Sequence, residues 1–246
     1  MKNTDVWQPS KFLPDGKQGR WKPNPDQMHP SSLYYTSAII DTYLRVIRQY
    51  ASGDLLDCGC GHVPFYTVYK DQVASITCID WANSLHQNQF LDVVADLNQP
   101  FPLESNAYDT VLATDVMEHI ARPWAFFGEI HRVLKPGGKV LLMVPFYFNI
   151  HEEPHDYYRY TEYALRLFCA DHQMEVLEVT PLGGYPDVLI HTVYRGFIRN
   201  RSLSKAVLPL FKTLRRWSFF QRWNRKTAGH YPLGYALVAE KIVETL

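Results

Sequence analysis

The residues best suited to chemistry in this chain surround a glycine turn that follows an apolar strand. The run Gly53–Gly61 reads Gly-Asp-Leu-Leu-Asp-Cys-Gly-Cys-Gly. Its two leucines predict the buried end of a strand, and Gly59 and Gly61 lack the Cβ atoms that hinder a sharp turn and a close approach of a ligand to the backbone. Asp57 is placed to accept hydrogen bonds from a cationic group and to balance its charge. This pattern predicts the start of a nucleotide-cofactor site.

Acidic residues end the next two predicted strands. Residues 74–80 end in Asp80, about 20 residues after the glycine turn, where a carboxylate can bind both hydroxyls of a ribose. Trp81 follows and either lies against an adenine ring or closes an edge of the core. Residues 90–96 end in Asp96. Two further segments are rich in Val, Leu and Met, as is typical of strands covered on both faces, and they span 108–114 and 138–145.

Helical patterns separate these strands. Periodic apolar residues predict helices over 33–50, 123–134 and 162–171. Pro123 suits a helix start, Lys135-Pro136-Gly137-Gly138 suits a stop, and Thr161 is placed to cap the third helix.

Several motifs resemble, in order and spacing, those of class I S-adenosylmethionine-dependent methyltransferases of the type 11 kind. The resemblance covers about residues 50–180 and rests on the glycine run, Ile79-Asp80, Ala95-Asp96-Leu97, Tyr108-Asp109, Asp115-Val116-Met117-Glu118-His119 and Arg132-Val133-Leu134-Lys135-Pro136-Gly137-Gly138. It implies a Rossmann-like α/β fold, with a seven-stranded, mostly parallel sheet, helices on both faces and an antiparallel last strand. Residues 235–243 are the expected last strand.

The resemblance also implies S-adenosylmethionine as the cofactor. In the family, residues matching Asp57 and the glycine turn hold the methionine part, the match to Asp80 holds the ribose, and the match to Asp96 meets the adenine amino group. Residues matching Thr114 and Asp115 line the methionine end. The cofactor-binding residues expected here are Asp57, Gly59, Cys60, Gly61, Asp80, Trp81, Asp96, Leu97, Thr114 and Asp115. The chain departs from the family at Val63 and Pro64, where a third glycine is common.

Two other functions remain as alternatives. A dinucleotide-dependent dehydrogenase shares the strand, the turn and the ribose acid, but its pyrophosphate site needs Gly-x-Gly-x-x-Gly, and Pro64 occupies the sixth position. A dehydrogenase also gives no role to Asp96. The other alternative is a regulatory protein that binds the cofactor without methyl transfer, although three strand-end acids and an intact glycine turn argue against a decayed site.

Two histidines are the candidate catalytic bases. Methyl transfer requires alignment of the acceptor with the methyl group and exclusion of water, and a hydroxyl acceptor also benefits from a base that takes its proton. An imidazole titrates near neutral pH. His119 follows the fourth strand, and His155 lies in the segment after the fifth strand, with Asp156 beside it to fix its tautomer.

The segment after the fifth strand also indicates the acceptor. Residues 154–161 resemble a loop of bacterial methyltransferases in surface-polysaccharide and related pathways, which favours a hydroxyl of a glycan or small molecule. N- or C-methyl transfer is the alternative. Arg159 and Tyr160 are the candidate substrate-binding residues, unless they only hold the loop in place.

Metal-binding patterns in the chain are weak. Residues 151–155 match His-Glu-x-x-His, but a zinc site of that kind needs both histidines on one face of a helix. Pro154 disfavours a helical conformation at Glu153. Cys58 and Cys60 have no second pair at metal spacing. We therefore predict no metal, and interpret the four cysteines as reduced, buried thiols of a cytoplasmic protein.

Chain length and the distribution of charge predict how the rest of the chain is organised. The 246 residues suit one domain at 33–246, preceded by a proline-rich arm or lid at 1–32.

The net charge is zero, yet residues 188–231 hold ten Lys or Arg and no Asp or Glu. This basic, aromatic insertion predicts contact with an anionic membrane or a phosphate-bearing acceptor, nucleic acid being a weaker alternative. It is also explained by two ordinary helices with a solvated basic face. We find no signal peptide and no run of about 18 apolar residues, and expect a cytoplasmic protein, which the membrane interpretation of the insertion would place at the inner face of the membrane.

Overall fold

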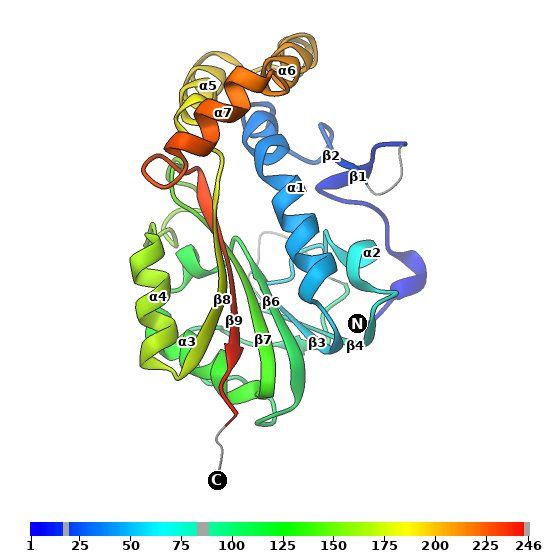
Figure 1. Cartoon of the computed structure of the whole chain (residues 1–246). Coiled ribbons are helices and arrows are strands. Elements are labelled where there is room, and N and C mark those ends of the chain that lie inside the picture. Colours follow the sequence, from blue (N-terminus) through cyan, green and yellow to red (C-terminus); the bar gives the residue numbers. More distant parts are fainter. Residues whose placement is uncertain (17–19, 83–88, 244–246) are drawn as a thin grey trace.

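The computed structural model of the chain describes residues 1–16, 20–82 and 89–243 (Figure 1). A seven-stranded sheet in the order β5-β4-β3-β6-β7-β9-β8 forms its centre. The strands are β3 (Gly53–Cys58), β4 (Val73–Asp80), β5 (Val93–Val94), β6 (Tyr108–Thr114), β7 (Leu134–Pro145), β8 (Met174–Leu182) and β9 (Gly234–Lys241). β9 runs antiparallel to both of its neighbours, and β3 to β7 pair in parallel. The predicted fold class and its antiparallel last strand are confirmed.

Helices cover both faces of this sheet (Figure 1). α1 (Leu33–Tyr50) and the short α2 (Tyr66–Tyr69) lie on one face, and α3 (Pro123–Val133) and α4 (Glu162–Asp171) lie on the other. Each face has its own apolar core, because the alternating side chains of the central strands point to opposite sides. The predicted cap of α4 is present, since the Thr161 hydroxyl accepts a hydrogen bond of 3.2 Å from the Ala164 amide.

The basic insertion forms three helices rather than two. α5 (Tyr185–Phe197), α6 (Arg201–Arg215) and α7 (Ser218–Thr227) gather beyond one end of the sheet, at the top of Figure 1. α5 begins before the basic stretch and contains the fully buried Asp187. The Asp187 carboxylate accepts hydrogen bonds from Tyr34 at 2.6 Å and Arg215 Nε at 3.1 Å. This buried ion pair ties α5 and α6 to α1.

The N-terminal arm is more regular than a proline-rich loop. It contains η1 (Thr4–Val6), the hairpin strands β1 (Phe12–Pro14) and β2 (Trp21–Pro23), and η2 (Pro30–Ser32). Its aromatic side chains pack on the segment after the glycine turn. Trp7 Nε1 donates to the Val63 carbonyl at 3.1 Å, and the Phe12 ring stacks on Phe65 at 4.9 Å. These contacts hold the arm against the domain.

Three strand predictions differ from the structure. The strand expected at 90–96 is reduced to Val93–Val94 at the sheet edge. β7 begins at Leu134, so the expected stop at 135–138 lies inside the strand as an irregularity, where Tyr108 pairs with Leu134 and Thr110 with Lys139. β8 was not predicted, because this edge strand pairs only with β9 and mixes Glu and Pro with apolar residues.

The four cysteines are buried thiols, as predicted. Within the described residues, no helix is both long and apolar enough to cross a membrane.

Candidate active site

A cavity of about 380 Å³ opens where β3, β4 and β6 end. Ligands of parallel α/β sheets bind at this carboxyl edge, because the loops that leave the strands meet there. Most of the predicted site residues line the cavity: Gly59, Cys60, Gly61, Asp80, Trp81, Asp96, Leu97, Thr114, Asp115, His119 and His155. The fold thus brings residues from five separate stretches of sequence around one space of a size suited to a small-molecule ligand.

The glycine turn at the cavity floor admits no larger residue. Gly59 has a φ of +64°, and a Cβ atom there would lie 2.4 Å from Cγ2 of Val116. The turn is held from the neighbouring strand, because Asp80 Oδ2 accepts the Gly61 amide at 3.0 Å. Asp80 therefore fixes the turn as well as facing the cavity. Asp96 makes a similar local contact, accepting the Asn98 amide at 2.9 Å.

Asp57 lies beneath the turn rather than in the cavity wall. Its side chain is buried and accepts a hydrogen bond of 2.9 Å from the Tyr69 hydroxyl. The pKa of Asp57 is raised to about 7, because burial and the Asp80 charge raise it by more than the Tyr69 hydrogen bond lowers it. Asp57 is not among the residues that line the cavity, and its predicted contact with the cofactor stays a prediction.

Asp115 occupies a strained backbone position at the methionine end of the predicted cofactor site. Its φ is +54°, a left-handed conformation that is uncommon for a residue with a side chain. Two contacts hold it there, because the Asp115 amide donates to the Met143 carbonyl at 2.9 Å and Oδ1 accepts from the Tyr43 hydroxyl at 2.7 Å. Such conformations cost about 1–3 kcal/mol and persist where surrounding contacts enforce them, often at functional sites.

The two candidate bases lie side by side on the cavity wall. His119 Nδ1 is 2.7 Å from the His155 carbonyl, and a carbonyl can only accept, so the proton lies on Nδ1 and leaves Nε2 as an acceptor. The His155 ring packs edge-on against Trp81 at 5.2 Å, and its Nδ1 is 3.1 Å from the Tyr157 hydroxyl. A proton acceptor is therefore available on this wall of the cavity.

Three residues that the sequence predicts to act in the site lie in the loop after β7 and make contacts within the protein. Asp156 was expected to fix the tautomer of His155, but it contacts Arg159 at 2.8 Å and His151 Nδ1 at 3.2 Å instead. Arg159 is occupied by Asp156 and by the Asn149 carbonyl at 3.0 Å. Tyr160 is buried, and its hydroxyl donates to the Met117 carbonyl at 3.0 Å. None of the three is among the residues that line the cavity, and these contacts position the loop, so their catalytic or substrate-binding roles stay predictions.

Residues 56–142 match the sequence profile of a family described as a methyltransferase domain. This part of the chain is a match to a methyltransferase domain, and the fold is that of S-adenosylmethionine-dependent methyltransferases. The match spans the glycine turn, the strand-end acids, the His119 segment and most of β7.

Similar proteins agree with this assignment of the methyltransferase fold. A crystal structure of an S-adenosylmethionine-dependent methyltransferase from Archaeoglobus fulgidus superposes with a TM-score of 0.56 at 15% identity, covering 82% of this chain and 93% of that one. An uncharacterized protein of Methanocaldococcus jannaschii is 31% identical over 37% of this chain and 40% of its own length. A phosphoethanolamine N-methyltransferase of Caenorhabditis elegans is 30% identical over 36% of this chain and 20% of its own. The chain thus spans less than half of the length of these two relatives.

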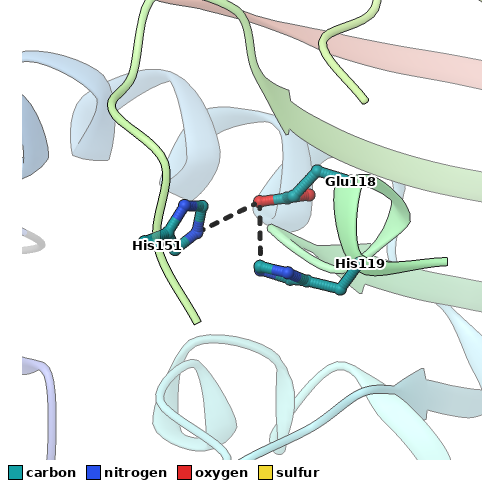
Figure 2. Close-up of side chains that lie close together, drawn as sticks. All are labelled: Glu118, His119 and His151. Atoms are coloured by element: carbon teal, nitrogen blue, oxygen red, sulfur yellow. Dashed lines mark ion pairs between the residues drawn. The ribbon is translucent and has the colours of Figure 1, made fainter. Parts of the chain in front are cut away.

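Several residues around the methyltransferase cavity were not predicted from the sequence. Ser10, Lys11 and Phe12 of the arm form part of its wall, and whether the arm acts as a lid stays a prediction. Glu118 and His151 lie next to the cavity beside His119 (Figure 2). Glu118 is fully buried, and its pKa is raised well above the usual value by burial and by the charge of Asp115. The sequence held a signal for each of the two. Glu118 directly precedes His119, and His151 is the first histidine of the His-Glu-x-x-His match.

Proposed function

We propose that this methyltransferase transfers the methyl group of S-adenosylmethionine to a hydroxyl of a small molecule or glycan. The observation that carries the proposal is the shared cavity, which the predicted cofactor residues line together with His119 and His155. The sulfonium methyl group is already activated, so the protein has to align the acceptor and exclude water.

The order of residues along the cavity favours a base near the transferred methyl group. Asp80 and Asp96 are expected at the ribose and adenine, whereas Thr114 and Asp115 are expected at the methionine end. His119 follows Asp115 by four residues through η3 (Met117–His119) and so lies on the methionine side. A histidine there can take the proton that a hydroxyl loses on attack, which favours O-methylation.

Methylation of nitrogen is the second candidate. The Caenorhabditis elegans relative is named for an amine acceptor, and an amine that binds in its neutral form needs no base before attack. Carbon acceptors and a cofactor-binding protein without transfer are the remaining alternatives. The variants of the two histidines described in the Discussion separate these possibilities.

Titration calorimetry tests the cofactor assignment. We expect S-adenosylmethionine and S-adenosylhomocysteine to bind with similar affinity, and NAD to bind far more weakly, because Pro64 stands where a pyrophosphate site needs glycine. Methyl transfer is then measured as formation of S-adenosylhomocysteine with panels of sugar and small-molecule acceptors. Tighter binding of NAD than of S-adenosylmethionine would contradict the proposal.

We further propose that α6 and α7 contact an anionic membrane surface. Four aromatic side chains of the helical insertion are exposed to solvent. Their exposed fractions are 76% for Phe197, 59% for Trp217, 71% for Phe219 and 37% for Trp223. Arg222 and Arg225 are exposed on α7, and the exposed Arg216 directly follows α6. Exposed aromatic residues beside basic ones suit the boundary between lipid headgroups and acyl chains. Such docking would place the enzyme near a membrane-bound acceptor.

Co-sedimentation with vesicles tests the membrane contact. The chain is expected to sediment with anionic vesicles and not with neutral ones, and salt is expected to release it. Changing Arg216, Arg222 and Arg225 to Gln removes about 3 kcal/mol, or roughly 100-fold in affinity, at about 1 kcal/mol per charge. Arg215 is left unchanged because it pairs with the buried Asp187.

A matched triple variant controls for loss of positive charge in general. Arg48, Arg122 and Arg166 are exposed and lie outside the three helices. Their replacement by Gln is expected to leave sedimentation nearly unchanged. Equal recovery of the native chain with neutral and anionic vesicles at low salt would favour solvated helices and a soluble acceptor.

A further inference from the structure

Three side chains that can bind a metal converge beside the cavity (Figure 2). Glu118 and His119 come from η3, and His151 comes from the segment after β7. The Nε2 atoms of His119 and His151 lie 3.7 Å and 3.9 Å from the same oxygen, Oε1 of Glu118. One donor atom of each residue lies within 4.8 Å of the other two.

The Glu118 carboxylate has no partner that explains its burial. Its side chain is 0% exposed, and among the described residues neither oxygen has a hydrogen-bond partner. The two histidine nitrogens are too distant to donate hydrogen bonds of ordinary length. Buried charged groups are normally paired, hydrogen-bonded or bound to a metal. Glu118 therefore faces two imidazole nitrogens without a hydrogen-bonded partner among the described residues, and a bound cation would supply that partner.

The other nitrogen of each ring is held by an acceptor. His119 Nδ1 contacts the His155 carbonyl at 2.7 Å, and His151 Nδ1 lies 3.2 Å from both the Asn149 carbonyl and Asp156 Oδ2. Carbonyl and carboxylate oxygens accept, so Nδ1 carries the proton and Nε2 presents its lone pair in each neutral ring. Metal-binding histidines are oriented in this way, with the second nitrogen donating to a carboxylate or carbonyl.

We propose that Glu118, His119 and His151 bind a divalent transition-metal ion, of which Zn²⁺ is the best match. Two imidazole nitrogens and one carboxylate oxygen form a ligand set used by Zn²⁺ in catalytic sites, where a further position stays open. Donor atoms about 2.1 Å from a tetrahedral ion lie about 3.4 Å apart, so small side-chain rotations bring these three to bonding distance.

The surrounding charges favour a cation at this place. The Glu152 carboxylate lies 3.9 Å from His119 Nε2, and the Asp115 and Asp156 carboxylates act electrostatically on Glu118. Arg159 is the positive group that acts on Glu118, and it is already paired with Asp156. Glu152 is also a candidate fourth ligand, because its side chain is 48% exposed and lines the cavity.

The position of the ion also indicates which molecule would occupy its open coordination position. His119 and Glu152 line the cavity, so an open coordination position on their side faces the space expected to hold the acceptor. An oxygen of the acceptor, from a hydroxyl or carboxylate, can bind there. This role rests on the proposed function, and with the ion bound His119 Nε2 is a ligand, so His155 is the remaining candidate base. Metal binding itself is independent of methyl transfer and is measured without any methyl donor.

Metal titration of the chain tests the proposal. The chain, freed of metal by chelation and without a histidine tag, is titrated with Zn²⁺, and with Co²⁺ as a spectroscopic probe. We expect one ion per chain, a visible Co²⁺ absorption typical of nitrogen and oxygen ligands at low coordination number, and a higher melting temperature with Zn²⁺. Glu118→Gln, which keeps the shape of the side chain, and His151→Ala are each expected to weaken binding at least about 100-fold.

His155→Ala is the matched control, because His155 lies on the same loop and outside the cluster. It is expected to bind metal within about threefold of the native chain. The proposal is overturned if the native chain binds no stoichiometric metal, or if Glu118→Gln and His151→Ala keep native affinity. Should either variant fail to fold, the other still decides the result, since the His151 side chain is 24% exposed and tolerates replacement better than Glu118. Failure of metal binding leaves methyl transfer untouched, and failure of methyl transfer leaves the metal titration valid.

Discussion

Replacing both His119 and His155 with Ala is expected to slow methyl transfer by roughly 10²-fold to 10⁴-fold, the usual contribution of a general base. The affinity for S-adenosylmethionine is expected to change little, because the predicted cofactor contacts come from the glycine turn and the strand-end acids. Turnover under saturating donor, followed as S-adenosylhomocysteine formation, measures the first quantity, and calorimetry measures the second. The two single variants then show which imidazole takes the proton.

His230→Ala is a suitable control, since His230 is exposed and does not line the cavity. It is expected to keep the native rate. If the double variant also keeps the native rate, proton removal does not use these residues, and a nitrogen or carbon acceptor becomes the better proposal. A loss of metal in the His119 variant, measured separately, identifies any part of the effect that comes from the ion.

Asp80→Ala is expected to weaken S-adenosylmethionine binding by about 1–3 kcal/mol, or roughly 5-fold to 150-fold. The physical reason is that two ribose hydroxyls lose their acceptor inside the cavity. Part of the effect comes from the turn, because Asp80 also accepts the Gly61 amide. Titration calorimetry of the native and variant chains measures the difference.

Two further variants separate these contributions. Asp80→Asn keeps an oxygen for the Gly61 amide but loses the charge and one acceptor, so its affinity is expected to lie between those of the native chain and Asp80→Ala. Asp71→Ala replaces an acid that is 88% exposed and does not line the cavity, and is expected to bind normally. Native affinity in Asp80→Ala would exclude Asp80 as the ribose ligand.

The fold class could be predicted from the sequence, because the patterns that indicate it are set by residues close together along the chain. Leu55 and Leu56 are buried within β3, Gly59 marks a turn that needs a positive φ, and Thr161 caps a helix through an amide three residues away. These features depend on neighbours along the chain, so they are readable before any tertiary contact forms. The edge strand β8 escaped prediction because its burial comes from one neighbour and its sequence mixes polar and apolar residues.

Residue order alone indicates which strand ends line the cavity, since parallel strands place their carboxyl ends at one edge whatever their lateral order. The partners of individual polar side chains follow only from the packing of the folded chain. Asp156 contacts His151 and Arg159 rather than the adjacent His155, and Asp57 turns away from the cavity towards Tyr69. Glu118 and His151 are 33 positions apart and meet through the loop after β7. Such contacts depend on side-chain direction and on the path of the loops, which the packing of distant elements sets and which residue spacing does not encode.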